Sequence, residues 1–196
     1  VELMKHFVGV TVLVIILTVL VGVALNTLGL LPDLASLQGQ FIDELFQVHI
    51  WIIAFLFALI MGFMLYSVVA FRRKEGDETD AAHIEGNNKL EITWTVIPLI
   101  VVLGVAAMGA NTLSKVTAID PQALEVKVVG QQWSWRFEYP ETGVVSDVLV
   151  LPENQQALLL MESNDVIHSF WVPEFRVKQD LVPGITTEVR ITPTEL

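Results

Sequence analysis

The sequence predicts an α+β membrane protein in which three transmembrane helices precede a small all-β domain. Three long stretches without a charged residue fill most of the first 113 positions, whereas the last third consists of short runs that alternate apolar and polar residues. The composition agrees, because 53% of the 196 residues are hydrophobic, only 17% are charged and the mean hydropathy is +0.60. Soluble domains carry about a quarter charged residues, so this composition excludes an ordinary soluble domain.

The three uncharged stretches cover residues 7–25, 50–71 and 92–113. Each is about 20 residues long, which is the length that crosses roughly 30 Å of hydrocarbon as a helix. Buried helices of a soluble protein are the alternative, and three uncharged stretches of this length disfavour it. Pro98 in the third stretch is compatible with a spanning helix, since neighbouring helices can satisfy the freed backbone groups.

The first stretch could also be a cleaved secretion signal, because Lys5 supplies a short basic start. However, the apolar run is longer than a typical signal core, and residues 22–26 show no small-x-small cleavage site. We therefore expect a retained helix over residues 1–31, an outer loop over 32–47 and a helical hairpin over 48–113.

Basic residues predict the orientation of these helices. Residues 32–47 contain neither lysine nor arginine, whereas basic residues precede the first span and lie within residues 72–91 (Lys5, Arg72, Arg73, Lys74, Lys89). The positive-inside rule then places the N-terminus and the 72–91 loop in the cytoplasm. Residues 114–196 are thereby delivered to the outer side of the membrane.

Residues 114–196 have the pattern of a β-sandwich or barrel. Short strands separated by turn-forming residues are predicted at 124–129, 144–151, 156–162, 166–172 and 186–192. An all-β fold of this kind usually needs a few more strands to close than about 80 residues provide. Strand alternation also places four aromatic residues on one face, which is typical of half of a sandwich core (Trp133, Trp135, Phe137, Tyr139).

Charge and cysteine content exclude several functions. The formal charge is −11, and the chain contains no cysteine. Nucleic-acid binding is disfavoured because such domains are usually basic, and these residues can form no disulfide, thiol nucleophile or cysteine-ligated metal site. Residues 114–196 hold twelve acidic and six basic residues. This excess indicates either simple solubility or an acidic surface that steers a basic partner protein.

Two ionisable residues, His168 and Glu91, each allow a purely structural and a functional interpretation. His168 lies in an apolar run, where a lone histidine is typically a satisfied core residue, although imidazole is also a good copper ligand. Glu91 precedes the third span, where a carboxylate favours a helix N-terminus electrostatically or collects protons at the mouth of a membrane pathway.

Four segments in order resemble subunit II of the haem–copper terminal oxidases, the cytochrome c oxidase type. They cover residues 91–98 (EITWTVIP), 130–139 (GQQWSWRFEY), 165–173 (DVIHSFWVP) and 178–184 (KQDLVPG). Their order and spacing agree with that family from about residue 45 onward. The first span is additional to the family's usual hairpin.

This resemblance implies a helical hairpin that carries an outer cupredoxin-like domain with a dinuclear copper centre. In the family, a soluble carrier (cytochrome c or a small copper protein) delivers electrons to this centre. The electrons pass to haems and a further copper in subunit I, where oxygen reduction is coupled to proton pumping. The implied partners are subunit I, other oxidase subunits and membrane lipids, and the implied location is a bacterial-type inner membrane.

The resemblance also assigns roles to individual residues. His168 matches a copper-ligand histidine, Trp133 matches the exposed tryptophan where the electron enters, and Glu91 matches a carboxylate at a proton-pathway mouth. Glu138 and Asp165 match acidic positions of the carrier-docking face.

The family's remaining copper ligands would follow the last residue of this sequence. We therefore expect two cysteines, a second histidine and a methionine beyond Leu196. The alternative is a copper-less subunit II, as in quinol oxidases, which serves as a structural membrane-anchored β domain.

Overall fold

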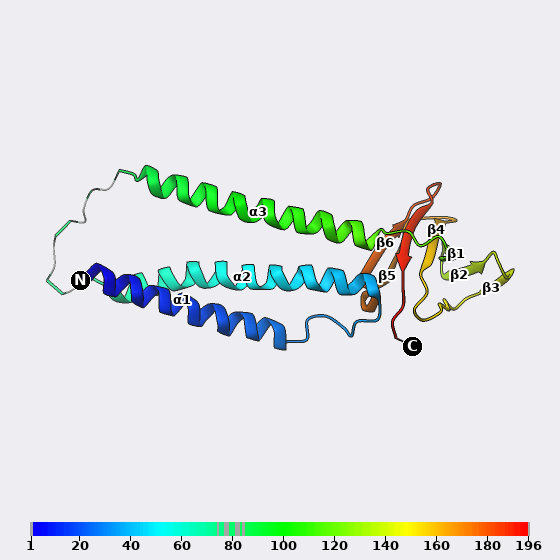
Figure 1. Cartoon of the computed structure of the whole chain (residues 1–196), viewed down its shortest axis with the longest axis horizontal. Helices are drawn as coiled ribbons and strands as arrows, with labels where there is room; N and C mark the ends of the chain where they lie inside the picture. Colours follow the sequence, from blue (N-terminus) through cyan, green and yellow to red (C-terminus); the bar gives the residue numbers. More distant parts are fainter. Residues whose placement is uncertain (1, 74, 77–78, 81–82, 84, 196) are drawn as a thin grey trace. The chain divides into compact units, whose positions relative to one another are not determined.

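The computed structural model describes residues 2–73, 75–76, 79–80, 83 and 85–195 (Figure 1). The chain divides into two compact units, of which the first comprises residues 1–30 and 46–107. The second unit comprises residues 31–45 and 108–196, so the segment that follows the first helix belongs to the same unit as the β domain.

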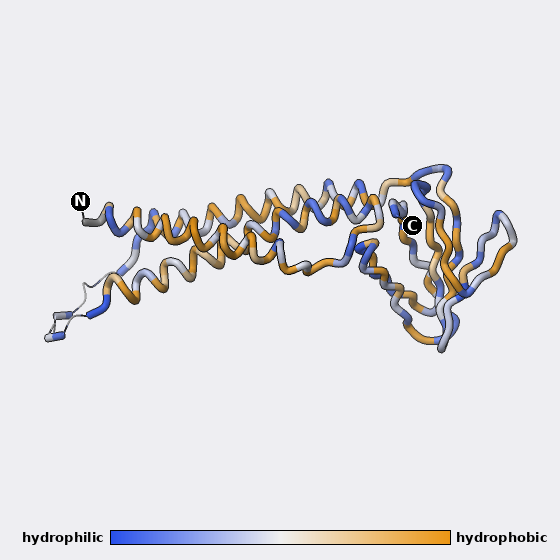
Figure 2. Tube along the Cα trace, turned by 90° about the horizontal axis from the view of Figure 1, so that it is seen from below, coloured by the Kyte–Doolittle hydropathy of each residue, from blue (hydrophilic) through white to orange (hydrophobic). Residues whose placement is uncertain are grey.

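Three long helices precede the strands, and their bounds are α1 (Glu2–Thr27), α2 (Leu37–Ala70) and α3 (Asn88–Val116). All three are long and apolar enough to cross a membrane, as predicted. Apolar residues run along most of each helix (Figure 2). The 72–91 loop predicted on the cytoplasmic side lies partly outside the described residues.

Helix α2 begins at Leu37, eleven residues before the predicted hairpin and inside the segment expected to be a loop. Ser36 caps this helix, because its Oγ accepts a hydrogen bond from the Gly39 N–H at 3.0 Å. A serine at this position satisfies one of the backbone donors that a helix start leaves free. The 34 residues of α2 extend beyond the roughly 20 that a bilayer requires.

Small residues allow α1 and α2 to approach closely in the first unit. A Cβ added at Gly62 would lie 2.7 Å from Val14 Cγ2, and one at Gly22 would lie 2.4 Å from the Trp51 ring. Ala58 on α2, one turn before Gly62, is completely buried. Glycine and alanine at such positions are typical of packed membrane helices. The retention of the first helix stays a prediction.

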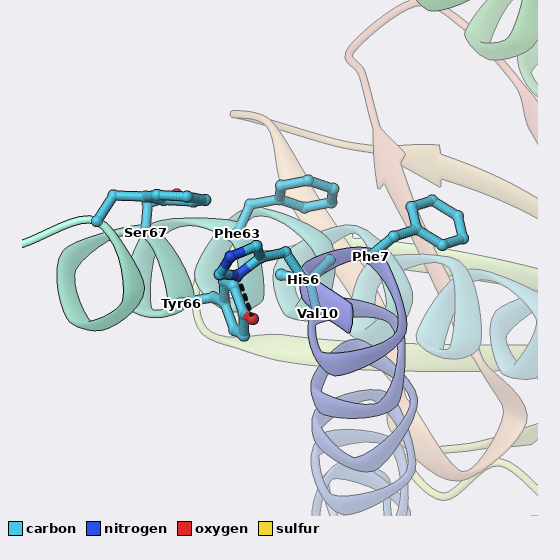
Figure 3. Close-up of a pocket in the computed structure, with 7 residues that line it drawn as sticks. His6, Phe7, Val10, Phe63, Tyr66 and Ser67 are labelled. Atoms are coloured by element: carbon cyan, nitrogen blue, oxygen red, sulfur yellow. Dashed lines mark hydrogen bonds between the residues drawn. The ribbon is translucent and has the colours of Figure 1, made fainter. Parts of the chain in front are cut away.

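A pocket of about 290 Å³ near the first turns of α1 is lined by residues of α1 and α2 (Figure 3). Its lining is almost entirely apolar and includes Phe7, Val10 and Phe63. Two rings with polar atoms, those of His6 and Tyr66, line this pocket. A hydrogen bond of 3.0 Å joins His6 Nδ1 to Tyr66 Oη. Such amphipathic rings are typical of the boundary between hydrocarbon and water.

The β domain contains two sheets. A mixed five-stranded sheet has the order β3-β2-β1-β4-β7, in which β1 and β4 are parallel and the other neighbours antiparallel. A two-stranded antiparallel sheet pairs β5 with β6. The strand bounds are β1 (Leu124–Gln131), β2 (Ser134–Tyr139), β3 (Val144–Ser146), β4 (Ala157–Ser163), β5 (His168–Val172), β6 (Val177–Leu181) and β7 (Thr187–Ile191), with a 3₁₀ turn η1 (Pro173–Phe175) between β5 and β6.

The core of the domain lies between the two sheets. Leu159 and Met161 on β4 and Val126 and Val128 on β1 are completely buried, as the alternation of these strands predicts. Phe170 and Leu181 cover them from the small sheet.

Strand β6 was not predicted, and the structure differs from the strand predictions in two further places. The strand expected over 144–151 ends at Ser146, because the Tyr139 hydroxyl accepts the Val150 N–H at 2.7 Å and donates to its carbonyl at 2.9 Å. This side chain thereby replaces a neighbouring strand as hydrogen-bond partner. Trp133 does not share the core face of Phe137, because it lies in the turn between β1 and β2.

Candidate functional site

His168 opens β5, at the edge of the sandwich where the β1–β2 turn and the β4–β5 loop meet. Its side chain is 17% exposed, and its ring lies 6.0 Å from that of Trp135 in an edge-to-face arrangement. A Cβ added at Gly130 would lie 3.1 Å from the imidazole Cγ and 3.2 Å from a methyl of Leu181. Glycine at position 130 therefore leaves the space that the imidazole occupies.

Asp165 holds His168 from the preceding loop. Its Oδ1 lies 2.6 Å from His168 Nε2 and accepts the Val166 N–H at 2.7 Å. Its Oδ2 accepts the Gln132 N–H, also at 2.7 Å. One carboxylate thus joins the loop that precedes β5 to the β1–β2 turn. A carboxylate on one imidazole nitrogen orients the ring and selects which nitrogen faces a further partner.

Trp133 follows Gln132 directly and is 92% exposed. Asp165 accepts a hydrogen bond from the N–H of the preceding residue, Gln132, whereas the Trp133 indole is exposed to solvent. The structure therefore brings the predicted electron-entry residue and the predicted copper ligand to the same end of the domain, joined through one carboxylate. Sequence reasoning assigned Asp165 to carrier docking and missed this connecting role, because the two loops are about 33 residues apart in the chain.

Glu138 lies on β2, away from this carboxylate network. Its Oε1 forms an ion pair with Arg136 Nε at 2.8 Å, and the side chain is partly exposed. The predicted docking role of Glu138 stays a prediction.

Glu91 lies in the first turn of α3. Its Oε1 is 3.4 Å from the backbone N–H of Asn87, whose own side chain accepts the Leu90 N–H at 3.1 Å. This reciprocal arrangement caps the helix start and agrees with the helix N-terminus interpretation. The proton-pathway role of Glu91 stays a prediction.

Hydrogen bonding lowers the pKa of Asp165 from its ordinary value of 3.8 to about 2, chiefly through His168 and then through the Gln132 N–H. A lowered pKa favours folding above the unfolded-state value, and this contribution is lost as the pH falls through the folded-state pKa. We expect the contacts between the two loops to persist at pH 4 and to be lost near pH 2. Carboxyl ¹³C chemical shifts of the full chain would show this, with Asp165→Asn identifying the resonance. A midpoint at 3.8 or above would contradict the prediction.

Metal-binding side chains are sparse around His168. Among the described residues, no group of three or more histidine, cysteine, aspartate or glutamate side chains could hold a metal ion, and the sequence contains no cysteine. His168 and Asp165 by themselves do not fit a dinuclear copper centre, which needs more donors than these two side chains offer.

Three spanning helices joined to a two-sheet β domain, with a histidine and an exposed tryptophan at one end, define a membrane-anchored β-domain protein. Two family models match this chain: the transmembrane domain of cytochrome c oxidase subunit II over residues 24–111, and its periplasmic domain over residues 143–195. The chain belongs to the cytochrome c oxidase subunit II family. The predicted family and fold class, spanning helices followed by a cupredoxin-like β domain, are thereby confirmed.

Individual relatives and one solved structure are similar to this chain. The chain is 31% identical to cytochrome c oxidase subunit 2 of Synechocystis sp., over 86% of this chain and 68% of the relative. It is 32% identical to the same subunit of Thermostichus vulcanus, over 81% of this chain and 65% of the relative. A solved structure, the periplasmic domain of subunit II of cytochrome oxidase from Bradyrhizobium japonicum, is 28% identical with a TM-score of 0.34. The match covers 40% of this chain and 77% of the chain in that structure. The chain thus spans about two thirds of the length of the first two relatives.

Proposed function

We propose that this chain is the electron-accepting subunit of a respiratory cytochrome c oxidase. It would take electrons from a soluble carrier and pass them towards the haems of subunit I, where oxygen reduction is coupled to proton pumping. Membership of the subunit II family supports this assignment. The structural observation that carries it is the joining of exposed Trp133, through Gln132 and Asp165, to His168.

We propose His168 as the copper ligand that these residues contribute, with the other ligands supplied from beyond Leu196. The Asp165 contact uses Nε2, which leaves Nδ1 as the nitrogen for a metal. A carboxylate partner of this kind is typical of metal-binding histidines, because it orients the ring and raises its basicity. When bound, the dinuclear centre would supply one-electron redox chemistry, and this chain would hold the imidazole in place.

The remaining assignments concern partners and location. Glu138 and Asp165 would attract a basic carrier, although both Asp165 oxygens already accept hydrogen bonds within the domain. Glu91 would stand at the mouth of a proton pathway. The spans would lie in a bacterial-type inner membrane with the β domain on the outer side, in contact with subunit I, other subunits and lipid.

A copper-less subunit II, similar to that of quinol oxidases, is the second candidate. The 196 residues contain no cysteine, so they do not by themselves supply the family's cysteine ligands. In that case the β domain would be a membrane-anchored scaffold for the other subunits, and Trp133 and His168 would have no redox role.

The two candidates predict different masses and copper contents for the subunit isolated from the assembled oxidase. We expect an intact mass clearly above 21.8 kDa, the mass of the 196 residues, and copper in the subunit. His168→Gln should lower that copper content while leaving assembly with subunit I unchanged. A mass near 21.8 kDa without copper would overturn the electron-accepting assignment and support the copper-less candidate.

A further inference from the structure

Residues 32–43, which we call the clasp segment, contact both sheets of the β domain within the second unit. They comprise the last residues of the connection after α1 and the first two turns of α2. Sequence analysis placed these residues in an outer loop without a role. Three sets of contacts join the clasp segment to the β domain.

The first set joins the clasp segment to the chain that follows β7. The Leu37 N–H donates to the Thr192 carbonyl at 2.9 Å, and the Thr192 N–H donates to Gln38 Oε1 at 2.8 Å. The Thr194 N–H donates to the Ala35 carbonyl at 3.0 Å. Gln38 is buried, and its amide nitrogen also donates to Thr192 Oγ1. These bonds tie the clasp segment to the end of the large sheet.

The second set joins the same segment to the turn η1, which connects the two strands of the small sheet. The Ala35 N–H donates to the Glu174 carbonyl at 2.9 Å. The hydroxyl of Ser36, which is completely buried, donates to the Phe175 carbonyl at 3.1 Å. The clasp segment therefore contacts the chain that leaves the large sheet and the turn within the small sheet. Between the two sheets themselves, the Thr187 hydroxyl on β7 donates to the Asp180 carbonyl on β6 at 3.1 Å.

The third set is a two-point ion pair between α2 and Arg176, the residue that ends η1 and directly precedes β6. Arg176 Nε lies 2.8 Å from Asp43 Oδ1, and Arg176 Nη2 lies 3.0 Å from Asp43 Oδ2. The guanidinium also donates to the carbonyls of Pro173 at 2.7 Å and Pro32 at 2.9 Å. The Arg176 side chain is only 8% exposed. Losing one partner of a pair this buried leaves an uncompensated charge.

The small sheet connects this ion pair to His168. Strand β5 runs from His168 to Val172 and leads directly into η1 and Arg176, and β6 returns so that Leu181 pairs with His168. The sheet is thus held at the η1 end by the clasp segment and ends at the other side on the imidazole that Gly130 and Leu181 enclose.

We infer that Arg176, held by Asp43, is a positioning residue for His168 that acts through the β5–β6 sheet. This inference rests on the proposed role of His168. The clasp segment fixes the position of the β5–β6 sheet against the five-stranded sheet. His168 contacts Gly130 and Asp165 only when the β5–β6 sheet holds this position.

The test compares Asp43→Asn with Glu44→Gln in the full chain reconstituted in lipid nanodiscs. Both variants remove one carboxylate from adjacent positions of α2, and Glu44 is exposed. We expect Asp43→Asn to raise amide hydrogen exchange in β5 and β6 about tenfold, with β1 and β4 unchanged, since local opening exposes separate units. The ring resonances of His168 should shift or broaden, while those of His6 stay in place. Asp43→Glu should restore both signals, and Glu44→Gln should resemble the unmodified chain.

Two outcomes would overturn the inference. Equal acceleration of exchange in both sheets would show that the ion pair serves general stability, and an unchanged His168 resonance would show that the clasp segment does not reach the imidazole. Ser36→Ala, which removes one hydroxyl, is a milder second variant if Asp43→Asn does not fold. These readouts need no copper, so a subunit that proves to be copper-less would refute the proposed function and leave the exchange result standing.

Discussion

Trp133→Phe is expected to slow electron uptake by the assembled oxidase about tenfold or more, which corresponds to roughly 1.4 kcal/mol in the barrier. The indole is 92% exposed at the end of the domain, so its replacement should alter the surface that meets the carrier without disturbing the core. Carrier affinity should change much less, because the substitution removes none of the acidic residues that we expect to face the carrier.

Stopped-flow oxidation of the reduced carrier would measure the rate, and the carrier concentration at half-saturation would report docking. Trp171→Phe is the matched control, because Trp171 on β5 is also exposed and its ring packs under Lys178. Unchanged turnover of the Trp133→Phe enzyme would contradict the assigned role.

Leu159→Ala is expected to have the largest effect on stability, lowering the free energy of unfolding of the β domain by about 2 to 5 kcal/mol. Leu159 is completely buried on β4, between the paired strands β1 and β7. Truncating its side chain removes apolar contacts and leaves a cavity, since a packed strand in the middle of a sheet cannot collapse to fill it.

Denaturant unfolding of the full chain in detergent, followed by tryptophan fluorescence, would measure this loss. Val145→Ala, at an exposed position of the edge strand β3, should change the free energy of unfolding by less than about 0.5 kcal/mol. Similar losses for the two variants would contradict the placement of the core.

Strand β1 was predicted from a clear alternation, because buried Val126 and Val128 alternate with Glu125 and Lys127. Strand β4 was predicted from a short apolar run bounded by turn-forming residues, and its buried residues alternate with half-buried leucines. Strand β6 carries charged or amide side chains at its three central positions, Lys178, Gln179 and Asp180, and was not predicted as a strand. It forms because β5 offers a complete antiparallel partner from His168 to Val172, and such pairing depends on the tertiary structure.

Some features of the candidate site were likewise predicted from the sequence, and others were found only in the structure. Sequence resemblance singled out Trp133, His168 and Asp165, but no local pattern indicated that a single carboxylate joins them. The role of Gly130 was also invisible in the sequence, because it depends on how closely the imidazole approaches that backbone.

The amino-acid sequence by itself determined the number of candidate spans, the acidic character of the β domain and the family. It could do so because hydrocarbon imposes a simple local rule, about 20 uncharged residues for each helix. Only the tertiary structure decided how His168 is held and that Asp43 pairs with Arg176, 133 positions later in the chain. Contacts between residues so far apart arise from the packing of both sheets, which no short window of sequence records.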